Sequence, residues 1–438
     1  MNKPIAPPVA DSAVNVREIV SPSGLRAWLV EDYAVPIVAV EFAIRGGSTQ
    51  DPTGLAGASG MIGALLDEGA GPLDSQAFQR ALDEKAVELS FHGDRDHLSG
   101  RLRTLARNLD RAGELMRLAI NEPRFDEAPF LRVREQMNAR LRHDANDPGH
   151  LASVGFRRRV FAGHPYAEPS EGEIESLAAI ELEGLKAHAR NLLTRSGLVV
   201  AIVGAVSPER AAKLVDELFA GLPAEGKRKS FPAAPFYGLG DLEIIDLDVP
   251  QSTIRFGRPA LKREDPDYMA SVVLAHVLGG GTGLSSRLFR EVREKRGLAY
   301  SIYAFHWAYS DSGLFGFYAG AAAKDAGDLM GAAIDCLAEA SERLGEDEIR
   351  RAKAQLKVST LTALESPSAR AHQIARQTFV YGAPLSLEDM LARIDAITLE
   401  DVRQVGSAML KSPPTVVAIG GVGKALDSAA VARRLKAN

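Results

Sequence analysis

The alternation of apolar and polar residues divides the chain into short strands and longer helices. Residues 25–30 and 37–44 are short and largely apolar, which predicts strands. Residues from about 98 to 119 and from 127 to 142 have apolar side chains at helical spacing, which predicts two long helices. Residues 198–203 form a continuous apolar run, typical of a strand covered on one or both faces. Strands grouped with long helices predict a layered α+β unit.

The same pattern occurs a second time along the chain. Two segments recur at an offset of 217 residues, and an earlier segment recurs at an offset of 214. A period this long exceeds that of a solenoid and indicates duplication of a whole domain. The predicted fold class is therefore α+β, with two homologous layered units. The matching segments are 177–183 with 394–400, 199–204 with 416–421, and 35–42 with 249–256.

The composition between the two copies predicts where the first unit ends. Residues 223–240 contain a run of three basic residues, several prolines and Gly238, which is typical of an exposed linker. We therefore expect an N-terminal unit over residues 16–222, a linker over residues 223–240 and a C-terminal unit over residues 241–432.

Length, charge and cysteine content narrow the classes of function. The chain has 438 residues and a formal net charge of −5, and its basic residues are scattered, which argues against a nucleic-acid binder. The single cysteine, Cys336, lies among apolar residues and is expected to be a buried thiol.

No segment reaches the roughly 18 apolar residues of a membrane-spanning helix. No signal-peptide pattern follows Met1, so we expect a soluble cytoplasmic or periplasmic protein, and a removed leader remains an alternative.

A glycine-rich segment in the second copy has the most specific local pattern. Residues 278–301 read LGGGTGLSSRLFREVREKRGLAYS, with Gly279, Gly280, Gly281 and Gly283 before a predicted helix at about 285–295. Glycines allow positive φ and close backbone approach. Phosphate binding by this loop is disfavoured, because the chain has neither GxxxxGK[ST] nor a dinucleotide-binding acid at the usual distance.

This segment resembles the C-terminal half of the pitrilysin-type (inverted zincin) metallopeptidases and of the subunits of mitochondrial processing peptidase. The resemblance extends from about residue 16 to residue 422 and includes the duplicated units. In that family an arginine and a tyrosine seven residues later hold substrate near the zinc. The matching residues in this sequence are Arg293 and Tyr300. The alternative is a structural arginine on a helix surface and a tyrosine of the core.

The zinc motif of that family is missing from the first copy. Catalytic members have HxxEH on the first helix, where two histidines bind zinc and the glutamate activates a water. Here the histidine positions match Gly60 and Ala64, and the glutamate position matches Gly63. The third ligand, a later glutamate, is matched by Arg140, 76 residues beyond Ala64. The resemblance therefore implies a degenerate metal site and no metal in this chain.

One other cluster of histidines and acids is a second candidate metal site. It contains His92, Asp94, Asp96 and His97. On a strand the first three would share one face, and His97 would point away from it. A polar strand with its turn is the favoured interpretation, because too few ligands face one point.

The resemblance also implies a function for the whole chain. Members of the family enclose their active site between two clamshell halves, which in some members are separate chains. The chain is thus predicted to be one clamshell half, a non-catalytic, substrate-binding subunit that is inactive alone. It would supply Arg293 and Tyr300 to a peptide-cleaving heterodimer whose zinc lies on an HxxEH partner. A structural core subunit and a stand-alone peptide-binding protein remain alternatives.

Overall fold

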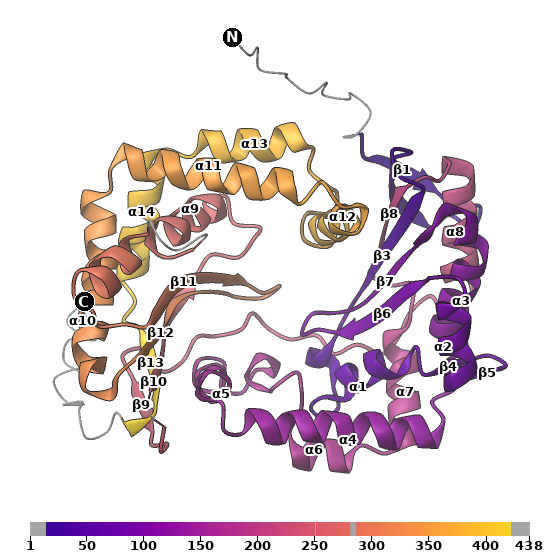
Figure 1. The fold of residues 1–438 in the computed structure, drawn as a ribbon, viewed down its shortest axis with the longest axis horizontal. Coiled ribbons are helices and arrows are strands. Elements are labelled where there is room, and N and C mark those ends of the chain that lie inside the picture. Colours follow the sequence, from indigo (N-terminus) through magenta and orange to yellow (C-terminus); the bar gives the residue numbers. More distant parts are fainter. Residues whose placement is uncertain (1–14, 250, 281–285, 422–438) are drawn as a thin grey trace, which may run out of the picture.

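Two mixed β-sheets with surrounding helices make up the computed structural model, which describes residues 15–249, 251–280 and 286–421 (Figure 1). The first sheet has the strand order β1 (Arg17–Val20), β2 (Arg26–Glu31), β8 (Leu198–Gly204), β3 (Ile37–Arg45), β7 (His97–Leu105) and β6 (Glu88–Gly93). The second has the order β9 (Leu242–Ile245), β13 (Thr415–Ile419), β10 (Ser252–Ala260), β12 (Gly313–Ala321) and β11 (Ser301–Ala308). A separate ribbon pairs β4 (Gly69–Ala70) with β5 (Leu73–Asp74).

The two sheets share one topology. The order β2-β8-β3-β7-β6 in the first sheet corresponds to β9-β13-β10-β12-β11 in the second. In each sheet the first of these pairs is parallel and the other three pairs are antiparallel. The shared order confirms the duplicated α+β unit that the sequence repeat predicts.

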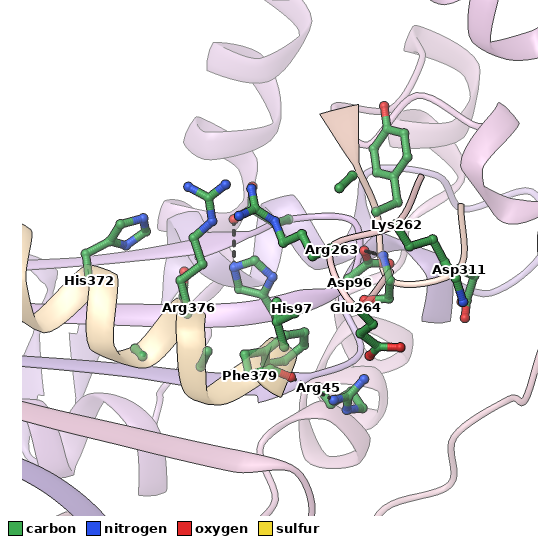
Figure 2. Close-up of a pocket in the computed structure, with 18 of the residues that line it drawn as sticks. Arg45, Asp96, His97, Lys262, Arg263, Glu264, Asp311, His372, Arg376 and Phe379 are labelled. Carbon is green, nitrogen blue, oxygen red and sulfur yellow. Dashed lines mark hydrogen bonds and ion pairs between the residues drawn. The ribbon is translucent and has the colours of Figure 1, made fainter. Parts of the chain in front are cut away.

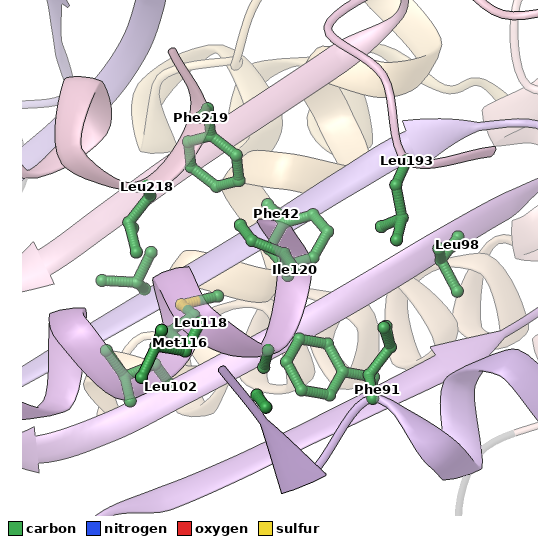
Figure 3. Packing of buried hydrophobic residues seen from close by; sticks show 14 of the residues in the cluster. Phe42, Phe91, Leu98, Leu102, Met116, Leu118, Ile120, Leu193, Leu218 and Phe219 are labelled. Atoms are coloured by element: carbon green, nitrogen blue, oxygen red, sulfur yellow. The ribbon is translucent and has the colours of Figure 1, made fainter. Parts of the chain in front are cut away.

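Alternation along the central strands decides which face of each sheet meets the main core. On β3, Val38, Val40, Phe42 and Ile44 point to one face, where they pack with helices α3 (Leu109–Asn121) and α8 (Pro208–Phe219). Phe42 lies at the centre of this cluster (Figure 3), with its ring centre 5.3 Å from that of Phe219. Burial of this apolar face is the main stabilising contribution to the unit.

The remaining helices surround the two sheets (Figure 1). In the first unit they are α1 (Ala58–Leu65), α2 (Ser75–Asp83), α4 (Glu127–Asp144), α5 (Pro148–Val160), α6 (Ile174–Ala179) and α7 (Leu182–Leu192). In the second they are α9 (Tyr268–Leu278), α10 (Ala326–Arg343), α11 (Glu346–Thr362), α12 (Pro367–Tyr381), α13 (Leu387–Ala396) and α14 (Leu399–Leu410). None of the helices within the described ranges is long and apolar enough to cross a membrane.

The units exchange one helix each. Helix α12 of the second unit packs on β3 and β8 of the first sheet, where Ala371 and Ile374 join a buried cluster with Ala39 and Val203. Helix α5 of the first unit packs on β10 and β13 of the second sheet. There the Phe156 ring lies against Gly257, where an added Cβ would come within 2.6 Å of it. Each sheet therefore has one face covered by its own unit and the other by its partner unit.

The segment between the two sheets, residues 223–240, contains no helix or strand. It is held to the first unit by Arg228, which donates to the Thr194 hydroxyl and the Ser196 carbonyl, both at 2.7 Å. Arg228 therefore anchors this connection beside the start of β8.

The predicted helix over residues 98–119 is wrong in its first half. Residues His97–Leu105 form β7, which pairs with both β3 and β6, and α3 begins only at Leu109. Leucines at 98, 102, 105 and 109 have helical spacing, but the buried residues Leu98, Leu102 and Thr104 lie at even positions, on one face of a strand. Pairing on both edges of β7 overrides the local helical pattern.

Candidate functional site

The first helix of the N-terminal unit begins at a buried carboxylate. Asp51 accepts hydrogen bonds from the backbone N–H groups of Gly57 and Ser59 at 3.0 and 2.9 Å, and lies 3.2 Å from Nε2 of His188. These contacts satisfy N–H groups that a helix start leaves without a partner. The degenerate motif positions therefore lie on a well-formed helix, α1.

Gly63 allows α1 to lie directly against β6. An added Cβ at Gly63 would lie 2.9 Å from the amide nitrogen of Gly93 and 3.2 Å from Cα of His92. The position that the family fills with its catalytic glutamate therefore has no room for a side chain unless α1 moves away from β6. Gly60 has more space, since an added Cβ would come no closer than 3.4 Å to any atom outside its own helix, and Ala64 is exposed.

Helix α4 brings no metal-binding group to α1. The Arg140 side chain is 81% exposed, and its Nε lies 3.7 Å from Oδ2 of Asp144. The α4 side chain that approaches Gly60 is Met137, whose Cε would lie 3.9 Å from an added Cβ. The residues at Gly60, Gly63, Ala64 and Arg140 do not fit a zinc ion, which needs imidazole, carboxylate or thiolate ligands.

Arg293 lies on a short helical segment anchored by Arg287. The Arg287 guanidinium donates to both oxygens of Glu348 at 2.8 Å and to the Arg343 carbonyl at 2.9 Å. Residues Phe289–Glu294 continue this segment as a π-helical turn. Arg293 is exposed, with its guanidinium carbon 4.9 Å from the centre of the Phe289 ring, a cation–π contact that orients the side chain.

Tyr300 follows a turn that leads the chain into β11. Gly297 has a φ of 65°, and its N–H donates to the Arg293 carbonyl at 3.1 Å. The Tyr300 N–H donates to the Gly320 carbonyl at 2.8 Å, and the Tyr300 side chain is 56% exposed. Within the part of the chain that the structure describes, the side chains of Arg293 and Tyr300 make no hydrogen bond or ion pair. The two predicted residues thus lie exposed on one helix–turn–strand connection.

The glycine-rich loop is described only in part. Gly279 ends α9, and an added Cβ there would lie 2.5 Å from the amide nitrogen of Ala304, so β11 requires glycine at this position. Gly280 follows it, and Gly281 and Gly283 lie outside the described residues.

A cavity of about 420 Å³ lies beside the degenerate motif, and we call it the α1 cavity. It is lined by Gly60 and Ala64, by the β6–β7 hairpin with His92, Asp94 and His97, and by part of α12. The hydrogen bond from His97, at 3.1 Å, lowers the pKa of the Asp94 carboxyl. Over the described ranges of the chain, no three histidines, acids or cysteines are placed to hold a metal.

A second cavity, of about 460 Å³, lies between the two units and is shown in Figure 2; we call it the inter-unit cavity. It shares Glu41, Asp94, His97, Ser99 and His372 with the α1 cavity, so the two adjoin. Glu41 is 4% exposed and accepts hydrogen bonds from Arg101 at 2.8 Å and His372 at 3.0 Å. Burial alone would raise the pKa of the Glu41 carboxyl, but these two partners outweigh it and lower the pKa.

The sequence patterns do not identify the inter-unit cavity. Its walls combine residues from distant segments, as in the contact between Glu41 and His372. No local motif signals such a pair, and only the exchange of α12 onto the first sheet brings it together.

Comparisons with known proteins agree with this architecture. The family model described as "Peptidase M16 inactive domain" matches residues 179–356. An uncharacterized zinc protease of Streptomyces coelicolor is 30% identical over 414 residues, which cover 92% of this chain and 89% of that protein. A probable mitochondrial-processing peptidase subunit beta of Arabidopsis thaliana is 25% identical and covers 95% of this chain and 80% of its own length.

Solved structures show the same similarity. The peptidase M16 inactive domain from Pseudomonas fluorescens has a TM-score of 0.85 and 28% identity, over 93% of this chain and 98% of that chain. With the duplicated sheets, the exchanged helices and the residues 278–301 already described, these matches establish that the chain belongs to the M16, or pitrilysin-type, family of metallopeptidases.

Proposed function

We propose that this chain is the non-catalytic, peptide-holding subunit of a two-chain zinc peptidase, with the HxxEH zinc centre on a partner chain. The observation that carries the proposal is a contrast within one molecule. Arg293 and Tyr300 are exposed with uncommitted polar groups, whereas α1 has no metal-binding side chain at Gly60, Gly63 or Ala64.

The chemistry of the pair suits a zinc peptidase supplied by another chain. When a zinc-activated water attacks a peptide carbonyl, negative charge develops on that oxygen, and the metal stabilises part of it. The Tyr300 hydroxyl is one further hydrogen-bond donor, and the Arg293 guanidinium provides several donors with a permanent charge. These two residues would hold the substrate and stabilise the charged oxygen from this chain's side of the shared active site.

The mutational test uses the complex of this chain with a homologous HxxEH chain, isolated by size-exclusion chromatography and assayed for peptide cleavage. We expect Tyr300→Phe to lower kcat by roughly 100-fold, as when one oxyanion donor is removed. Arg293→Ala should also raise KM, because it removes ground-state binding as well. Neither change should alter zinc content or assembly.

Matched controls lie in the same segment. Tyr303→Phe changes a neighbouring exposed tyrosine whose ring stacks on Tyr318 at 4.9 Å, and Arg296→Ala changes a nearby exposed arginine. Both controls should retain full turnover. If the chains do not associate, or if the Tyr300 and Arg293 variants cleave at the unmodified rate, the proposal fails and a structural core subunit becomes the better assignment.

A further inference from the structure

The inter-unit cavity combines three separate parts of the fold. Its walls come from the β3 and β7 ends of the first sheet, from α12, and from the loops that follow β10 and β11 in the second unit. A volume of about 460 Å³ is within the range of small-ligand sites and accommodates a few residues of a peptide.

Most acidic groups of the cavity already have partners. Asp96 accepts hydrogen bonds from the Tyr166 hydroxyl at 2.7 Å and the Ser310 N–H at 3.0 Å. Glu41 is paired with Arg101 and His372, as described above. Of these two carboxylates, Glu41 therefore has basic partners, whereas the donors to Asp96 are neutral groups.

Two arginines of the cavity are left without counter-ions among the described residues. Arg263, from the loop after β10, and Arg376, from α12, both line the cavity, and neither has an ion pair with any residue that the structure describes. In Figure 2 their guanidinium groups extend toward the same side of the cavity. Arg263 is held in place by its own backbone, whose carbonyl accepts the Tyr381 hydroxyl at 3.3 Å. Two like charges brought into one cavity repel each other unless an anion lies between them.

The other charged residues of the cavity constrain what that anion is. Glu264 and Asp311 also line the cavity and lie away from the two guanidinium groups in Figure 2. A single carboxylate matches a pair of guanidinium forks, and it adds less negative charge than phosphate to a cavity that already contains these acids. The apolar side chains of Phe379 and Val380 provide contact area for the rest of the ligand.

We propose that the inter-unit cavity binds the C-terminal carboxylate of a peptide through Arg263 and Arg376. This inference rests on the proposed function, because it gives a location to one end of the peptide that the subunit holds. The α1 cavity adjoins this site, with which it shares lining residues, so the preceding residues of the peptide would extend toward α1.

The test measures binding of a fluorescent peptide to the full chain, without a partner, by fluorescence polarisation. The peptide contains no Asp or Glu, so its terminal carboxylate is its only acid, and the comparison peptide is the same sequence with a C-terminal amide. We expect the free acid to bind about 10-fold more tightly, since a charge-assisted contact contributes on the order of 1.5 kcal/mol. A third peptide, with an internal Glu and an amidated end, should bind like the amide.

Variants assign the effect to the two arginines. Arg263→Gln and Arg376→Gln should each reduce the preference for the free acid to about 3-fold or less and leave amide binding unchanged. Arg107→Gln, an exposed arginine at the far end of β7, is the matched control and should retain the preference. Inorganic phosphate at millimolar concentration should not compete.

Distinct results overturn the inference and the proposed function. Equal binding of acid and amide by the unmodified chain, no measurable peptide binding, competition by phosphate, or an unchanged preference in both arginine variants overturns the carboxylate site. Failure to pair with an HxxEH chain would overturn the proposed function but would leave a measured preference for the free acid intact.

Discussion

Asp67, directly after α1, is a carboxyl group whose protonation should affect stability near neutral pH. Burial is the main cause that raises its pKa to about 6, and the neighbouring Glu68 carboxylate adds to the shift. Because the folded pKa lies above the ordinary value of 3.8, the ionised form is penalised only in the folded protein. This residue's contribution to stability is complete below about pH 4 and is lost as the pH rises through 6.

Asp67→Asn removes that penalty. We expect its Tm to exceed that of the unmodified chain by a few degrees at pH 8, by less at pH 5, and by almost nothing near pH 3, below the ordinary pKa of 3.8. Thermal unfolding followed by circular dichroism across this range measures the difference. Asp83→Asn, at an exposed position, is the control for loss of a charge. A constant difference for Asp67→Asn would contradict the prediction.

One pair of equivalent positions shows how much of a residue's surroundings the sequence repeat predicts. The repeat aligns Glu41 with Arg255, and both are buried on the sheet face that the partner unit covers. Glu41 is paired with Arg101 across the β3–β7 ladder, whereas Arg255 faces Tyr318 across β10–β12 and lies 5.0 Å from the Trp307 ring. The alignment predicts the backbone position, but the partners depend on cross-strand neighbours that no single segment contains.

At the scale of elements, the exchanged helix α12 should link the stability of the two units. Ile374 is 6% exposed and packs against the first sheet. Ile374→Asp would bury a charge there, and we expect it to cost about 3–5 kcal/mol. Val358→Asp on α11 is the matched control, because Val358 is 59% exposed, and it should be nearly neutral.

Limited proteolysis and thermal unfolding distinguish linked units from independent ones. Linked units predict one transition at a lower temperature for Ile374→Asp, with both sheets cleaved together. Two separated transitions, with one unit retaining the Tm of the unmodified chain, would contradict the linkage.

Helix exchange also explains which elements sequence patterns could predict. The buried strands and the duplication follow from local apolar runs, and the predicted strands at residues 37–44 and 198–203 are confirmed as β3 and β8. The first half of the predicted helix at 98–119 is a strand because its pairing partners lie far along the chain. The inter-unit cavity is a feature of the same kind, since its contact between Glu41 of β3 and His372 of α12 joins residues 331 positions apart in the chain.

For the whole molecule, the packing of α1 predicts that substituting the HxxEH residues into α1 is not enough to restore a zinc site. We expect the chelator-washed chain to hold no stoichiometric zinc. Gly60→His with Ala64→His should fold, whereas adding Gly63→Glu should lower the Tm, because a side chain there meets the β6 backbone at 2.9 Å. Elemental analysis and thermal unfolding of the double and triple variants measure both effects. One tightly bound zinc in the unmodified chain, or a triple variant as stable as the double variant, would contradict this account.

The reciprocal placement of α5 and α12 also bears on how such a chain can originate. Because each unit covers the other's sheet with the equivalent helix, the contact between them is nearly isologous, as in a twofold-symmetric homodimer. An ancestor with a single unit would have packed this helix on the sheet of a second copy, and the two copies would have formed a closed dimer. Gene duplication followed by fusion would then need only a connection such as residues 223–240 to make that pair permanent. Two fused halves could then diverge independently, which would account for Glu41 and Arg255 at equivalent positions.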